Sequence, residues 1–182
     1  VPGIVANNFV QCTDTTGISI MNGAYQDIVY NSVNMTGSIT SSSALSFHGS
    51  AVGIFVRNNN LVNTGGGYCY VIGAPADTGI VSSNYNNLHF TGTNIGRSSG
   101  VNRTSLAAWV TATQSDTNSV SVDPGFISVS DLHASATAMD NKGTPLSNIG
   151  DDIDGTIRSL TTPDIGADEF SGVSRDLGVI AI

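Results

Sequence analysis

Short apolar segments alternate with runs of Asn, Ser, Thr and Gly through the first hundred residues. Four of these segments begin with Ile, and successive Ile residues lie 24, 26 and 26 positions apart. A second set of segments lies between them, at residues 17–20, 44–47 and 68–71. Each segment is brief, apolar or alternating, and bounded by turn-forming residues, which is typical of strands rather than helices.

A strand pattern that repeats about every 25 residues predicts an all-β fold, a parallel β-helix in which each coil stacks on the last. Parallel crossovers are almost always right-handed, so we expect a right-handed helix of about four coils with an irregular C-terminal cap. An antiparallel sandwich is the alternative, but the long period and the absence of two-residue hairpin turns count against it. The expected inward row is Ile4, Ile28, Ile54 and Ile80, and the expected stacked amides are Asn7 or Asn8, Asn31, Asn58 and Asn84.

The repeat stops near residue 100, which divides the chain. Residues 1–100 are the expected coils, residues 101–170 an acidic cap packed on the solenoid, and residues 171–182 a linker or the start of a following β domain. The spacing within residues 105–113, around the single Trp109, predicts a short helix or irregular segment. Because the last coil of a solenoid exposes strand edges and apolar rows, we expect this segment to cover it.

Composition narrows the function classes. The 182 residues include 6 basic and 14 acidic side chains, for a net charge of −8 that lies mostly after residue 100. Dispersed cations in an acidic chain argue against nucleic acid as a partner, and no apolar run is long enough for a membrane span. Cys12 and Cys69 are a little over two coils apart, roughly 10 Å along the axis, so we expect free thiols.

Aspartate motifs follow one another in the second half, ending with DDIDGTIR at residues 151–158 and PDIGADEF at residues 163–170. This series resembles the C-terminal region of bacterial right-handed β-helix repeat proteins, the stretch called a choice-of-anchor Q domain. The resemblance implies a β-helix in a secreted or cell-surface protein of Bacteroidetes type. It implies no particular activity.

The first of these motifs has the Asp-x-Asp-Gly spacing of many calcium loops. Asp151, Asp152 and Asp154 are the candidate ligands, and Ca²⁺ is the cofactor that such oxygen donors suit. The alternative is that these side chains cap turns and that one of them pairs with Arg158.

The coils lack the groups that β-helix enzymes need. Asp14 and Asp27 are half a coil apart, so they are expected on different sides, whereas glycoside hydrolysis needs paired carboxylates. We therefore expect a non-catalytic scaffold, adhesin or polysaccharide-binding face, with neighbouring domains of a longer chain and extracellular polysaccharide or surface glycan as partners. The candidate sugar-stacking residues are Tyr68, Tyr70 and Tyr85, unless they are half-buried strand residues. The alternative function is the C-terminal part of a polysaccharide lyase or glycoside hydrolase whose catalytic coils precede residue 1.

Overall fold

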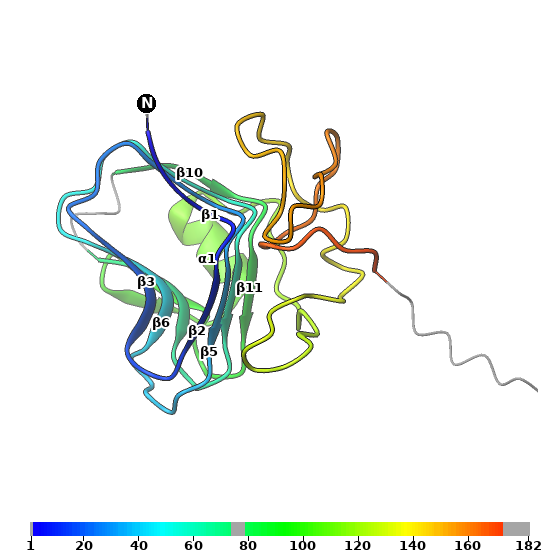
Figure 1. Ribbon diagram of the computed structural model, residues 1–182. Helices are drawn as coiled ribbons and strands as arrows, with labels where there is room; N and C mark the ends of the chain where they lie inside the picture. The colour runs from blue at the N-terminus through cyan, green and yellow to red at the C-terminus, as the bar shows by residue number, and fades with distance from the viewer. Residues whose placement is uncertain (1, 74–78, 173–182) are drawn as a thin grey trace, which may run out of the picture.

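Short strands stack into three sheets, parallel except for the last strand of one of them, that wind around one apolar core (Figure 1). The computed structural model describes residues 2–73 and 79–172. Sheet A contains β1 (Gly3–Ala6), β4 (Gln26–Val29), β7 (Ile54–Arg57) and β10 (Ile80–Asn84). Sheet B contains β2 (Phe9–Cys12), β5 (Ser32–Met35), β8 (Asn60–Asn63) and β11 (Asn87–Phe90). Sheet C contains β3 (Thr16–Met21), β6 (Ser43–His48), β9 (Tyr68–Ile72), β12 (Gly96–Ser98) and β13 (Val101–Arg103).

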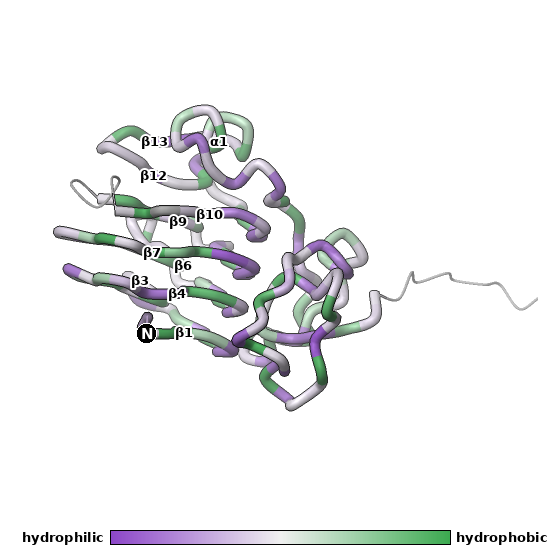
Figure 2. The backbone as a smooth tube through the Cα atoms, turned by 90° about the horizontal axis from the view of Figure 1, so that it is seen from above, coloured by the Kyte–Doolittle hydropathy of each residue, from purple (hydrophilic) through white to green (hydrophobic). Residues whose placement is uncertain are grey.

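This arrangement is a parallel β-solenoid, which confirms the predicted fold class. It makes about three turns rather than the four that the repeat suggests. The chain completes three turns from β1 to β10, but the next one ends early because β13 folds back antiparallel against β12. Figure 2 shows the tiers stacked one above another, with α1 beyond the last of them.

The inward row of sheet A differs from the expected one. Val5 lies opposite Ile28, and Ile28 lies opposite Val56, whereas Ile4 lies opposite Asp27 and is 45% exposed. The prediction of a row through the four Ile residues was therefore wrong. Turn lengths vary, so equal sequence spacing does not give equal register, and a slip of one residue moves a side chain to the other face of a strand.

A ladder of stacked amides runs along the corner between sheets A and B. Asn8 donates to Asn31 (2.8 Å), Asn31 to Asn59 (2.9 Å) and Asn59 to Asn86 (3.2 Å), each through Nδ2 to Oδ1. These partners are 23, 28 and 27 residues apart, which is the real length of each turn. The structure therefore confirms a stack of amides through Asn8 and Asn31. In the third and fourth turns its members are Asn59 and Asn86, not the predicted Asn58 and Asn84.

The residue before each ladder amide turns the corner with a positive φ. Asn7, Tyr30, Asn58 and Tyr85 have φ values of 53°, 51°, 58° and 58°. Asn tolerates this left-handed conformation, but Tyr rarely adopts it, so the ladder and its packing must hold Tyr30 and Tyr85 in place. Asn58 therefore shapes the turn, while its neighbour Asn59 makes the amide stack.

One glycine is required by the stacking at the corner between sheets B and C. A Cβ on Gly65 would lie 1.6 Å from the backbone oxygen of Gly37 in the preceding turn. No side chain fits there, because consecutive turns touch through their backbones.

The helix α1 (Leu106–Thr113) closes the end of the solenoid, as residues 105–113 predict. It begins after Ser105, whose side chain accepts a hydrogen bond from the Ala108 amide. Trp109 is 1% exposed and packs on Tyr70, with 4.9 Å between the two ring centroids, over the last apolar layer of the core.

Asp116 ends the amide ladder beneath this helix. Its carboxylate accepts hydrogen bonds from Asn86 Nδ2 (2.9 Å), Ser83 Oγ (2.9 Å), Trp109 Nε1 (2.8 Å) and Ser119 Oγ (2.7 Å). Each ladder amide donates to the amide of the next turn, and among the described residues no further asparagine follows Asn86 in the ladder. Its Nδ2 therefore needs another acceptor. Asp116 therefore satisfies the last donor and ties α1 to the solenoid.

The rest of the tail runs along the flank of the solenoid, in the yellow-to-orange loops of Figure 1. Thr144 O accepts hydrogen bonds from Tyr30 (2.9 Å) and Asn58 (2.8 Å), and Asp151 O accepts one from Asn7 (2.8 Å). These contacts reach from the third turn back to the first. The tail thus packs on the side of the solenoid, beside the amide-ladder corner, and not only over its end.

Two further expectations concern cysteines and membranes. Cys12 and Cys69 are both free, as predicted, and Cys69 is buried. Within residues 2–73 and 79–172, no helix is long and apolar enough to cross a membrane.

Candidate functional site

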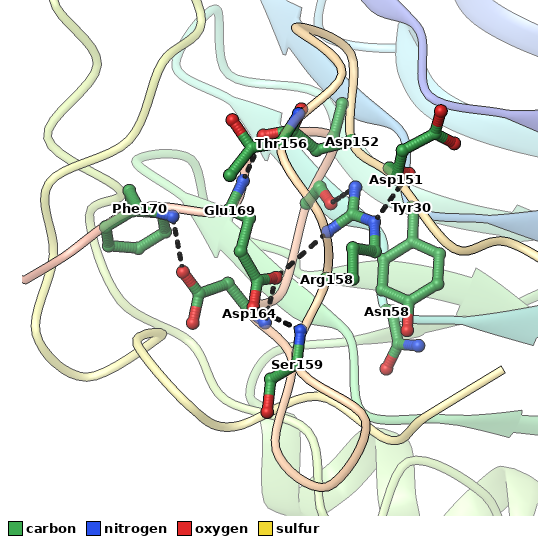
Figure 3. Close-up of polar contacts among 12 residues, drawn as sticks. Tyr30, Asn58, Asp151, Asp152, Thr156, Arg158, Ser159, Asp164, Glu169 and Phe170 are labelled. Carbon is green, nitrogen blue, oxygen red and sulfur yellow. Dashed lines mark hydrogen bonds and ion pairs between the residues drawn. The ribbon is translucent and has the colours of Figure 1, made fainter.

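Arg158 is the centre of the contact between tail and solenoid (Figure 3). Its guanidinium carbon lies 3.9 Å above the ring of Tyr30, and its nitrogens reach Asn7 Oδ1 (3.0 Å), Gly166 O (3.2 Å) and Glu169 Oε2 (3.4 Å). Arg158 is 3% exposed, so these partners replace the water that its charge has lost. Burial raises the pKa of the Tyr30 phenol to about 12, so Tyr30 stays neutral and donates its hydrogen bond.

The carboxylates of the two aspartate motifs hold backbone amides in this contact. Asp152 accepts from the amides of Asp154 (2.9 Å), Thr156 (2.8 Å) and Glu169 (2.9 Å). Glu169 in turn accepts from the amides of Ser159 (2.9 Å) and Asp164 (3.0 Å). Side chain–backbone hydrogen bonds therefore hold the motifs DDIDGTIR and PDIGADEF together. We call Arg158, Asp152 and Glu169 the Arg158 clasp.

Asp164 is a buried carboxyl near the clasp whose pKa is raised. It is 2% exposed, and burial raises its pKa to about 6, although the amides of Asn141 and Phe170 donate to it. Its two amide donors explain why it is kept inside despite this desolvation cost.

A second group of carboxylates surrounds His133, on the tail near the first turn. Nδ1 of His133 is hydrogen-bonded to Asp131, and Nε2 lies 2.7 Å from Asp154 Oδ2. The ring packs edge-on against Phe9 of β2, with 4.9 Å between ring centroids. The hydrogen bonds to Asp131 and Asp154 raise the pKa of His133 to about 9, so without a competing cation the imidazole is protonated at neutral pH.

The predicted calcium ligands do not share one role. Asp151 is exposed, Asp152 is engaged by backbone amides, and Asp154 faces His133. Among the described residues, His133, Asp154 and Asp168 are the three whose possible metal-ligand atoms lie within 4.8 Å of one another. The geometry therefore favours a different set of donors, of which only Asp154 belongs to the predicted three.

The predicted tyrosines lie apart. Tyr70 is fully buried between Phe47 and Trp109, which removes it from any surface site. Tyr68 is half-buried on sheet C and its hydroxyl donates to Asn102 Oδ1 (3.1 Å), whereas Tyr85 is half-buried at the corner of sheets A and B. The structure does not bring these three rings to a common face.

A groove of about 380 Å³ instead lies on the outer face of sheet B, which we call the sheet B groove. Its other wall is the tail segment from Asp123 to Val129, and Asn34 Nδ2 donates to Val129 O (3.0 Å) across it. The solenoid side is lined by Asn34, Thr36, Val62, Thr64 and His89.

Neither the groove nor the His133 group is predicted by the repeat. His133 stands in an Asp-x-His pattern, which is the signal available in the sequence, but its partners follow 21 and 35 positions later in irregular loops. The groove depends on the tail doubling back over sheet B, and no periodicity describes that path.

Comparisons with known proteins add no further identification. The chain matches no family model, no curated protein and no solved structure.

Proposed function

We propose that this chain is a non-catalytic β-solenoid module of a secreted or cell-surface bacterial protein that binds an extended, neutral polysaccharide in the sheet B groove. The motifs DDIDGTIR and PDIGADEF support the right-handed β-helix type with a choice-of-anchor-Q-like end. The observation that carries the binding function is a groove that crosses three stacked strands and is lined by uncharged polar and apolar residues together with one carboxylate.

The groove suits a polymer because its lining positions recur along the solenoid axis. Thr36 and Thr64 follow the ends of β5 and β8, and Asn34, Val62 and His89 lie opposite one another on β5, β8 and β11. Equivalent positions recur at the strand spacing of about 4.8 Å, so a long ligand meets side chains at a regular interval, two of them threonines. Phe126 in the facing wall adds an apolar surface for a sugar ring.

The chemistry of the groove favours binding over cleavage. Asp123 is the single carboxylate among its lining residues, and its Oδ1 already accepts the Gly125 amide at 2.9 Å. Glycoside hydrolysis needs two carboxyl groups on either side of the bond to be cleaved. The scarcity of charge also explains why we propose a neutral polymer rather than an acidic one.

The test is equilibrium binding of the purified chain to a panel of neutral and acidic polysaccharides. We expect a neutral polymer to bind, and His89→Ala to weaken that binding about fivefold, as the loss of one hydrogen bond would. His48→Ala is the matched control, since His48 ends β6 on sheet C and lies outside the groove. Equal weakening by both variants, or release of reducing sugar on incubation, would contradict the proposal.

A further inference from the structure

We propose that His133, Asp154 and Asp168 form a binding site for a divalent transition metal ion of the zinc type. Each of the three offers one ligand atom, and these atoms lie within 4.8 Å of one another. They come from three separate tail segments, the turn after Asp131, the DDIDGTIR loop and the PDIGADEF loop. The site does not depend on the proposed polysaccharide function.

Asp168 is the buried member of this group. It is 7% exposed, and one of its carboxylate oxygens accepts a hydrogen bond from the Ala134 amide (3.2 Å). Withdrawing a carboxylate from water is costly, and a cation bound beside it would offset that cost.

The nearby charge also favours a cation. Three carboxylates, on Asp131, Asp154 and Asp168, surround the single imidazole of His133. When His133 is protonated, the group still carries a net charge of −2. A divalent ion bound to neutral His133 would neutralise the same carboxylates more completely.

The donor set selects the class of metal. One imidazole nitrogen and two carboxylate oxygens suit Zn²⁺, which binds three protein ligands and leaves a position for water. Ca²⁺ prefers six to eight oxygen ligands, so the imidazole makes calcium a poor fit here. Asp131 is hydrogen-bonded to Nδ1 of His133 and holds the ring with Nε2 facing Asp154, and a carboxylate on the far nitrogen is usual for metal-binding histidines.

Access and movement are compatible with metal entry. The side chains of His133 and Asp154 are 33% and 54% exposed. Zn²⁺ requires bond lengths of about 2.1 Å, and the exposed side chain of Asp154 has room to rotate toward an ion held by the other two donors. Since the ring of His133 also packs on Phe9, a bound ion would fasten the tail to the first turn of the solenoid.

The experiment is titration of the untagged, chelator-treated full chain with ZnCl₂, followed by calorimetry and thermal unfolding. We expect one equivalent of Zn²⁺ to bind, and the melting temperature to rise by roughly 5 °C at a hundredfold excess over Kd. CaCl₂ at the same concentration should leave the melting temperature unchanged. No Zn²⁺ binding, or stabilisation by Ca²⁺ in preference to Zn²⁺, would overturn the proposal.

Variants assign the site to these residues. Asp154→Asn is the first choice because its exposed side chain can change without unfolding the chain, and it should weaken Zn²⁺ binding at least tenfold. His133→Gln should abolish binding. His48→Gln and Asp123→Asn are matched controls outside the cluster and should bind Zn²⁺ as the unmodified chain does. Unchanged Zn²⁺ affinity in Asp154→Asn and His133→Gln would refute the assignment.

Discussion

At the scale of single residues, the few charged side chains of the chain provide hydrogen-bond partners for buried groups that would otherwise lack them. Asp116 is the acceptor at the end of the amide ladder, and Asp152 collects three amides of the tail. Arg158 donates to both the solenoid and the tail while covering Tyr30. Such buried charges are tolerated because each is almost fully partnered.

Asp164 gives a prediction about pH. Its pKa is raised to about 6 in the folded chain, against an ordinary value of 3.8, so the folded state holds its proton longer than the unfolded state does. This residue's contribution to stability is therefore fully present below pH 4 and is lost as pH rises to 6.

The measurement is the free energy of unfolding of the unmodified chain and of Asp164→Asn from pH 3.5 to 7. Relative to Asp164→Asn, the unmodified chain should lose on the order of 2 kcal/mol between pH 4 and 6. A difference between the two proteins that stays constant over this range would show that Asp164 is not desolvated as described.

At the scale of elements, the strands are predictable and their register is not. Alternating apolar residues such as those of 44–47 predict strands because they need only local information, and β6 indeed covers Ser43–His48. The inward row of Ile4, Ile28, Ile54 and Ile80 fails because turns of 23, 28 and 27 residues shift each strand against the last. Turn length depends on corner packing between turns, which a single strand's pattern does not contain.

The amide ladder is the element whose chemistry is most demanding. Asn59 Nδ2 donates to Ile28 O (2.8 Å), Arg57 O (3.1 Å) and Asn86 Oδ1 (3.2 Å), and Asn59 is fully buried. Asn59→Asp would place a carboxylate against these three acceptors. We expect it to destabilise the fold by about 3 kcal/mol or more.

Urea unfolding measures this loss, and Asn118→Asp provides the control. Asn118 is exposed, and it bonds to Asn84 through its backbone amide alone. Asn118→Asp should therefore change stability by less than about 0.5 kcal/mol. Similar losses in the two variants would mean that the ladder does not stabilise the solenoid through its amide donors.

At the scale of the whole molecule, a regular solenoid is flanked by an irregular tail that the Arg158 clasp holds in place. The sequence predicts both regions and a pairing of Arg158 with an acid of DDIDGTIR, but the carboxylate that Arg158 pairs with is Glu169 of PDIGADEF. It does not predict the path of the tail, because contacts such as that of Arg158 with Asn7 join positions 151 residues apart. The sheet B groove and the His133 group both depend on that path.

Arg158→Lys tests the clasp. Lysine keeps the charge but cannot donate in several fixed directions while lying flat on Tyr30, so we expect a loss of about 2–3 kcal/mol and faster proteolysis within residues 140–170. Arg97→Lys, at an exposed position on sheet C, should change neither property. A tail equally resistant to protease in Arg158→Lys would contradict the role of the clasp.

Binding of a neutral polysaccharide in the sheet B groove is tested by hydrogen exchange with and without the bound polymer. We expect slower amide exchange in residues 123–130 and at Thr36, Thr64 and His89, with sheet C unchanged. Protection confined to sheet C, or no protection at a polymer concentration that saturates the chain, would contradict it.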